Sequence, residues 1–294
     1  MRTETIAEQI FFTTAFIVVS SPTVSMKGTG FVYRVDVEGG SALFLATNRH
    51  LVKDFTNMTI KFVADDGTSN AKLGEYVAVE INDLQASGWV GHPNNDVDVA
   101  IVPIAHAIEA LQRNGKPAFF KSLTPEIVFE IGVTPDLSPL EEITFVGYPE
   151  GLFDETNHLP IVRRGMTATP IEVDFNGLPS FIIDAGVYQG SSGSPVFILN
   201  QGWVIDRLGN ATLGNRAILL GIVAANYHRY SEALVQEQTG KFSATFREAI
   251  GLGVVFKAKC VDECADIYLV GKGYKRIPTA VPLVDSGKSE SAAT

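Results

Sequence analysis

The chain contains little cysteine: Cys260 and Cys264 are the two cysteines among 294 residues. Secreted proteases of this size often carry several disulfides, so this composition favours a reducing compartment, and we expect the protein in the cytoplasm. Two cysteines four positions apart on a helix are poorly placed to form a disulfide. We expect two small buried residues on one helix face, because no partners for a metal site are found near them. No metal or other cofactor is expected.

The sequence also lacks a long hydrophobic run and an excess of positive charge. Residues 10–19 are apolar, but this run is too short and too rich in threonine to span a membrane. Glu4 and Glu8 precede it and no small-residue cleavage site follows, so we interpret it as a strand rather than a signal peptide. The 23 basic and 33 acidic residues give a net charge of −10, which argues against nucleic acid or an anionic membrane as the main partner.

The chain is rich in short strand patterns separated by turn residues. Its 27 glycines and 18 phenylalanines suit an all-β protein with many turns. Six segments suffice for a small closed barrel, and they cover residues 11–19, 30–37, 42–47, 58–64, 75–81 and 97–104. A second set of six covers residues 142–148, 161–169, 181–184, 195–199, 217–225 and 253–257. Helices are predicted over residues 105–113 and 257–269.

The most informative segment reads Gly190-Ser191-Ser192-Gly193-Ser194-Pro195 and lies between two apolar runs. A serine between glycines at such a junction can expose its hydroxyl while neighbouring backbone N–H groups converge on one point. Acyl transfer needs that combination of a nucleophile and donors for an oxyanion. His50 ends an apolar strand and can serve as the base, and Asp98 opens an apolar run and can orient the imidazole.

Three motifs in the same order carry a resemblance to a known family. Thr47-Asn48-Arg49-His50 matches T-N-x-H, Asp98-Val99-Ala100 is close to D-L-A, and residues 184–195 follow the pattern around the family's serine. The chain therefore resembles the chymotrypsin-like serine peptidases, and most closely the HtrA/Deg-type and bacterial trypsin-like peptidases without a PDZ domain. Ser191 and Ser194 depart from the pattern, because the family usually has Asn or Asp and a second Gly there.

The resemblance implies two six-stranded antiparallel Greek-key barrels with a short C-terminal helix. We expect an N-terminal barrel at residues 1–118, a linker at 119–140 and a C-terminal barrel with its helix at 141–270. The polar composition of residues 271–294 predicts a disordered tail. The implied activity is hydrolysis of peptide bonds in protein or peptide substrates through an acyl-enzyme intermediate.

The same resemblance implies a role for each candidate residue. Ser192 would be the nucleophile, His50 the general base and Asp98 the orienting acid, with the N–H groups of Gly190 and Ser192 as the oxyanion hole. The implied substrate-binding residues are Gly186, Tyr188, Gln189, Ala224, Ala225 and Asn226. No acid stands near Gly186 to bind Lys or Arg, and residues 223–225 lack the histidine of glutamate-specific relatives. The resemblance therefore favours a neutral pocket for small or medium apolar side chains.

Rival residues and a rival function remain. Asp96 lies two residues before Asp98, and we expect it to be a solvated loop acid. The other histidines, which we expect to be solvated or structural, are His92, His106, His158 and His228. The alternative function is a catalytically silent protease-like domain used for binding. A cytoplasmic protease must be restrained, so we also expect limited or regulated action, with a regulatory partner or an oligomer.

Overall fold

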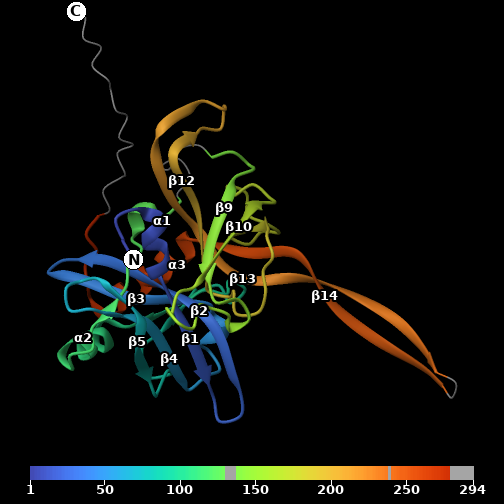
Figure 1. Cartoon of the computed structure of the whole chain (residues 1–294), viewed down its shortest axis with the longest axis horizontal. Helices are drawn as coiled ribbons and strands as arrows, with labels where there is room; N and C mark the ends of the chain where they lie inside the picture. Colours follow the sequence, from blue (N-terminus) through green and yellow to red (C-terminus); the bar gives the residue numbers. More distant parts are fainter. Residues whose placement is uncertain (130–136, 238–239, 279–294) are drawn as a thin grey trace, which may run out of the picture.

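The computed structural model describes residues 1–129, 137–237 and 240–278. Most of these residues form strands, arranged as two antiparallel sheets with few helices (Figure 1). The predicted all-β, chymotrypsin-like fold of two β-barrel bodies and a C-terminal helix is confirmed. Residues 130–136 of the expected linker and residues 279–294 of the expected tail lie outside the described residues.

The first sheet has the strand order β5-β4-β1-β2-β3-β7-β6, and β8 pairs with β4. Its strands are β1 (Thr14–Ser20), β2 (Ser25–Val37), β3 (Gly40–Thr47), β4 (Asn57–Asp65), β5 (Ala71–Ile81), β6 (Val90–Gly91), β7 (Ala100–Pro103) and β8 (Ala118–Phe119). The six longer strands correspond to the six predicted segments, and β6 and β8 add two residues each. Alternating side chains such as Ile17, Val19, Met58 and Ile60 fill the core of this sheet, which is why the apolar pattern located the strands.

The second sheet is a closed barrel with the order β10-β11-β14-β13-β12-β9. Its strands are β9 (Glu142–Gly147), β10 (Ile161–Thr167), β11 (Ser180–Asp184), β12 (Pro195–Ile205), β13 (Ala211–Glu237) and β14 (Gly240–Lys257). Phe145, Phe181 and Val255 are buried in its core. A further apolar cluster, which includes Phe44 and Phe197, joins this barrel to the first sheet.

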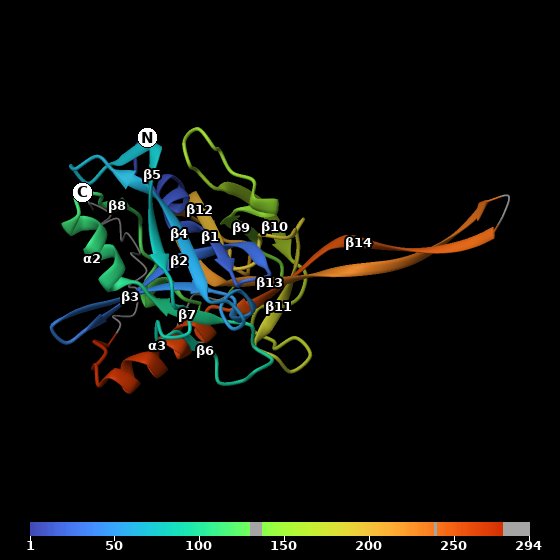
Figure 2. The same ribbon diagram turned by 90° about the horizontal axis from the view of Figure 1, so that it is seen from below.

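Two hairpins extend far beyond the barrel. The β12–β13 pair continues to Ile205↔Ala211, and the β13–β14 pair runs from Gly221↔Lys257 out to Glu237↔Gly240. The second hairpin projects well away from both sheets in two views (Figures 1 and 2). The sequence prediction covered the barrel parts of these strands and missed the extensions. A two-stranded ribbon has no second layer to pack against, so it does not need the apolar alternation on which the prediction depended.

The helices are α1 (Ile6–Gln9), α2 (Ala105–Arg113) and α3 (Lys259–Lys272). Although α3 follows the second barrel, it packs on the first sheet, where Tyr268 stacks edge-on against Phe44 at 5.1 Å between ring centroids. No helix in residues 1–129, 137–237 or 240–278 is long and apolar enough to cross a membrane.

The expectation of disorder from residue 271 onward is wrong for residues 271–278. Helix α3 continues to Lys272 and ends at Gly273 in the left-handed conformation. Arg276 then donates hydrogen bonds to Asp262 (2.8 Å) and Asp266 (2.7 Å) on α3. It also forms a backbone bridge with Val37 at the end of β2. The polar composition concealed this docking because the contacts are ion pairs and backbone hydrogen bonds rather than apolar packing.

Candidate active site

His50 and Asp98 lie at neighbouring strand ends in the first sheet. His50 is in a 3₁₀ turn, Arg49–Leu51, directly after β3, and Asp98 lies just before β7. The two strands pair with Thr47 opposite Ala100, and this register brings the two residues together. Their partly exposed side chains meet at 2.5 Å between Nδ1 of His50 and Oδ2 of Asp98.

Further hydrogen bonds fix the carboxylate of Asp98 against the turn. The backbone N–H of His50 donates to Oδ1 of Asp98 at 2.9 Å, and Asn48 Nδ2 donates to the Asp98 carbonyl at 2.7 Å. Because a carboxylate accepts hydrogen bonds, the imidazole carries its proton on Nδ1. Nε2 of His50 is therefore left with a lone pair that can accept a proton, as a general base requires.

Ser192 lies in the loop between β11 and β12 of the second barrel, and Thr29 of β2 connects this loop to the first sheet. The backbone N–H of Thr29 donates to the Ser192 carbonyl at 2.9 Å. Thr47 Oγ1 donates to the Thr29 carbonyl at 2.8 Å, three residues before His50. The serine loop and the histidine turn are thus held by a shared strand. The Ser192 hydroxyl itself donates to the Ala224 carbonyl at 3.3 Å.

Two glycines allow the serine loop to approach its neighbours closely. Gly190 has φ +81° and Gly193 has φ +89°, in the left-handed region that other residues rarely adopt. A Cβ atom at Gly193 would overlap the Thr29 carbonyl oxygen, and one at Gly190 would overlap the Tyr148 carbonyl oxygen. Glycine is therefore required at both positions by backbone angle and by space.

The backbone N–H groups of Gly190 and Ser192 were the expected oxyanion hole. Neither donates a hydrogen bond to another described residue. Ser191, which departs from the family pattern, is buried, and its hydroxyl accepts a hydrogen bond from the Tyr188 N–H at 3.3 Å. The Ser191 N–H donates back to the Tyr188 carbonyl at 3.0 Å. A short hydroxyl at this position therefore braces the loop locally.

The predicted substrate-binding residues form two adjoining segments. Asn226 Nδ2 donates to the Val187 carbonyl at 3.0 Å, which ties residues 224–226 to residues 186–189. Tyr188, Gln189 and Ala225 are exposed, whereas Ala224 is buried and offers its carbonyl to Ser192.

The surroundings of Gly186 contain a positive charge that the expectation of a neutral pocket did not include. A Cβ atom at Gly186 would lie 2.6 Å from Nη2 of Arg163, so a guanidinium stands directly beside this position. Arg163 comes from β10, and its charged group also lies over the ring of Tyr188, 4.8 Å from the centroid. No motif in the sequence marks Arg163. Its position depends on how β10 pairs with β9 and β11. The sequence located the strand β10, but it did not show which of its side chains face the serine loop.

The rival acid and three of the rival histidines have other surroundings. Asp96 is exposed, and Asn94 Oδ1 accepts its backbone N–H. His106 is fully exposed on α2. His158 lies between the rings of Tyr76 and Phe153, where burial and the Lys61 ammonium lower its pKa more than Asp154 raises it. His228 lies in β13, where its backbone pairs with Ala249.

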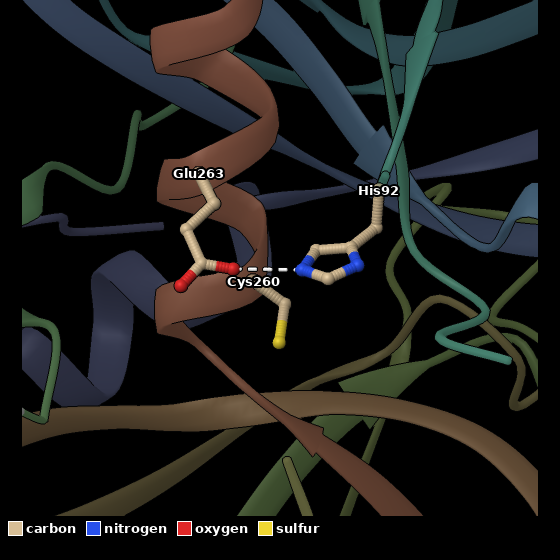
Figure 3. Close-up of side chains that lie close together, drawn as sticks. All are labelled: His92, Cys260 and Glu263. Carbon is tan, nitrogen blue, oxygen red and sulfur yellow. Dashed lines mark hydrogen bonds and ion pairs between the residues drawn. The ribbon is translucent and has the colours of Figure 1, made fainter. Parts of the chain in front are cut away.

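His92, the remaining rival, belongs to a second cluster with Cys260 and Glu263 of α3 (Figure 3). The ligand atoms of all three lie within 4.8 Å of one another, so Cys260 does have neighbours that could bind a metal. They come from a distant segment, which explains why the local sequence did not show them. Nε2 of His92 lies 2.7 Å from the Glu263 carboxylate, and Nδ1 accepts the Asn94 N–H at 3.2 Å.

These hydrogen bonds define the chemistry of the cluster. Because Nδ1 of His92 accepts a hydrogen bond, Nε2 carries the proton and donates it to Glu263, which leaves no free imidazole lone pair for a metal. Burial raises the pKa of Cys260 to about 12, so its sulfur is a protonated thiol. In this arrangement the cluster fastens α3 to the segment that leads into Asp98.

Comparison with known proteins gives a family match. A family model described as a trypsin-like peptidase domain matches residues 28–205. No curated protein sequence matches the chain. A serine endoprotease from Yersinia pestis is similar in structure, with 14% identity, a TM-score of 0.47 and coverage of 92% of this chain and 69% of that one. The protease Anisep from Arthrobacter nicotinovorans shows 11% identity, a TM-score of 0.47 and coverage of 90% and 98%.

Proposed function

The chain belongs to the trypsin-like peptidase family, and from this premise we propose how its residues break a peptide bond. It is a serine endopeptidase that acts on protein or peptide substrates. In the proposed reaction, Ser192 Oγ attacks the carbonyl carbon while His50 Nε2 takes the hydroxyl proton. His50 then returns that proton to the leaving amine, and an acyl-enzyme forms. Water, deprotonated by His50, then attacks the acyl carbon, the ester bond to Ser192 Oγ breaks, and His50 returns the proton to that oxygen as the carboxylic acid product leaves.

The observation that carries this proposal is the pairing of His50 with Asp98. Two hydrogen bonds, at 2.9 Å and 2.5 Å, hold one carboxylate against both the backbone and the ring of the histidine. This arrangement supports a fixed ring with Nδ1 protonated, and the carboxylate would stabilise the imidazolium that forms during attack. An ion pair between an aspartate and a histidine on an exposed surface would not need the additional hydrogen bond from the backbone N–H of the histidine to the carboxylate.

The attack also requires the Ser192 hydroxyl to change its partner. Its hydrogen bond to the Ala224 carbonyl is 3.3 Å long, which is longer than the usual range of about 2.5–3.0 Å for an O–H donor and therefore weak. Rotation about the Cα–Cβ bond would release the hydroxyl toward the imidazole at a small cost in free energy. The N–H groups of Gly190 and Ser192 would then bind the oxyanion, a contribution worth about 10²- to 10³-fold in rate for each donor.

We further propose that this peptidase acts inside the cell on few substrates. The two cysteines are free and buried, which fits a reducing cytoplasm. A Ser192 hydroxyl that is hydrogen-bonded to Ala224 fits a site that becomes active when substrate, a regulatory partner or a second copy binds.

Labelling with a fluorophosphonate probe tests the proposal, because the probe reacts with serines activated by a base. We expect the wild type to be labelled, Ser192→Ala to lose all labelling, and Ser194→Ala to keep it. Ser194 is a matched control because it lies in the same loop but is fully buried. If the wild type stays unlabelled while trypsin reacts in the same mixture, and remains so at high protein concentration and after a peptide substrate or a cell lysate is added, the silent binding domain is the correct function.

A further inference from the structure

Arg163 places a positive charge against the loop that carries Ser192. It lies on β10 opposite Phe145 of β9, and its guanidinium carbon is 5.3 Å from the centre of the Phe145 ring and 4.8 Å from that of Tyr188. The guanidinium also lies beside Gly186 of this loop, where the absence of a side chain leaves space for it. The cation is therefore held between two aromatic rings beside the expected substrate-binding residues.

The guanidinium of Arg163 lacks an acceptor. Its Nη1 atom is buried and has no hydrogen-bond partner among the described residues. Aromatic faces attract a cation, but they do not accept the directed hydrogen bonds of guanidinium N–H groups. Buried donors are normally paired, so an unpaired one indicates a missing partner.

No acid near the serine loop pairs with Arg163 among the described residues. Residues 185–192 and 222–227 contain no aspartate or glutamate. Asp184, which precedes them, is exposed, and Glu150, whose N–H donates to the Gln189 carbonyl, forms no ion pair with the guanidinium. By contrast, Arg216 in the same barrel pairs with Glu141 at 3.4 Å, and Lys257 pairs with Asp174 at 2.6 Å. Arg216 and Lys257 are thus paired with acids, whereas the half-buried Arg163 has no acidic partner among the described residues.

We propose that Arg163 makes this peptidase select an acidic side chain, glutamate or aspartate, immediately before the cleaved bond. This proposal rests on the proposed function of Ser192. A carboxylate beside Gly186 would accept two parallel hydrogen bonds from the guanidinium, the strongest pairing available to arginine. A lysine or arginine at the same position would meet a like charge, and an apolar side chain would leave Nη1 unpaired.

Arg164 provides a matched control on the same strand. Successive residues of a strand point to opposite faces, and Arg164 lines a separate groove with Ile6, Phe11 and Trp203. Arg164→Gln therefore removes the same charge from β10 without touching Gly186 or Tyr188. An effect of Arg163→Gln that Arg164→Gln does not share is due to the position of the charge and not to the net charge.

The experiment uses a peptide series that differs in one residue, with Glu, Asp, Gln, Leu or Lys before the scissile bond. We expect the wild type to cleave the Glu or Asp peptide with the highest kcat/KM, and Arg163→Gln to lower that value about 10- to 100-fold, as for loss of a hydrogen bond to a charged group. Glu and Gln peptides should then be cleaved alike, while Arg164→Gln keeps the wild-type preference. Arg163→Glu should favour the Lys peptide.

Fluorophosphonate labelling of each variant separates the two proposals. A variant that is labelled at the wild-type rate has an intact Ser192 site, so its peptide preference reports on Arg163 alone. If Arg163→Gln does not fold, the test uses Arg163→Lys together with the preference of the wild type between the Glu and Gln peptides. The inference is overturned if labelled wild type prefers Leu, Gln or Lys, or if Arg163→Gln leaves the preference unchanged. An unlabelled wild type overturns the proposed function and this inference with it.

Discussion

Asp98 accepts hydrogen bonds from both the backbone N–H and the ring of His50, so one carboxylate sets the position and the tautomer of the histidine. The contact joins the turn after β3 to the segment before β7. It depends on the strand register that places Thr47 opposite Ala100. A change at either residue therefore alters the chemistry of the site without altering the packed core.

Asp98→Asn should lower kcat by about 10³- to 10⁴-fold with little change in stability, because an amide in place of the carboxylate favours the wrong imidazole tautomer. Steady-state cleavage of a peptide by Asp98→Asn and by Asp96→Asn checks this. Asp96 is exposed and two residues away, so its variant should keep wild-type activity. Equal losses in both variants would argue against Asp98 as the orienting residue.

Gly193→Ala should abolish activity and destabilise the fold. The substitution combines an unfavourable backbone angle with overlap of the new Cβ and the Thr29 carbonyl. Gly209→Ala is the matched control: Gly209 has φ +86° and open space around it, so it should cost about 1 kcal/mol from backbone strain alone. Thermal unfolding and peptide cleavage measure both effects. A Gly193→Ala protein with wild-type activity would contradict the close approach of the serine loop to β2.

His158 should make stability fall as the pH falls. Burial and the nearby Lys61 lower its pKa below the ordinary value of 6.5, so the unfolded chain binds a proton more readily than the folded chain. The stability contribution of the neutral ring is present above pH 6.5 and is lost as the pH falls through the folded pKa. The free energy of unfolding, measured with urea, should therefore fall more for the wild type than for His158→Asn when the pH is lowered from about 7.5 to about 5.

Asparagine is the suitable replacement because His158 has φ +59°, a conformation that asparagine tolerates. His106→Asn serves as the control, since the His106 side chain is fully exposed. Its pH profile should match that of the wild type. If His158→Asn and the wild type lose stability in parallel as the pH falls, the ring is not held in the neutral form by its surroundings.

The sequence was sufficient to predict the two strand sets, and it identified His50 and Asp98 as candidates that the structure places in contact. Strands such as residues 58–64 bury one face, so local apolar alternation revealed them. The motifs around residues 47–50 and 98–102 are local too, and their pairing follows once β3 and β7 are neighbours.

Features that depend on long-range contacts could not be predicted in this way. The place of Arg163 beside Gly186 requires the register of β10, and the cluster of His92 with Glu263 joins residues 171 positions apart. The length of the β13–β14 hairpin follows from strand pairing that continues from Gly221↔Lys257 out to Glu237↔Gly240, which no sequence motif marks. The chain after residue 270 is held by charges that a composition argument assigns to solvent.

Arg276 therefore offers a test of how the end of the chain contributes to stability. Arg276→Met removes its hydrogen bonds to Asp262 and Asp266 and leaves both carboxylates without their cation, although Tyr33 still donates to Asp262 at 2.9 Å. We expect a loss of about 1–3 kcal/mol in the free energy of unfolding, as for partly buried hydrogen bonds to charged groups. The control is Lys275→Met, which removes an exposed ion pair with Glu38 and should lower the free energy of unfolding by about 0–1 kcal/mol. Because the Arg276 side chain bonds, among the described residues, only to α3, the loss should appear as easier unfolding of residues 259–272 in hydrogen exchange. Equal exchange in the two variants would mean that apolar packing alone holds the helix.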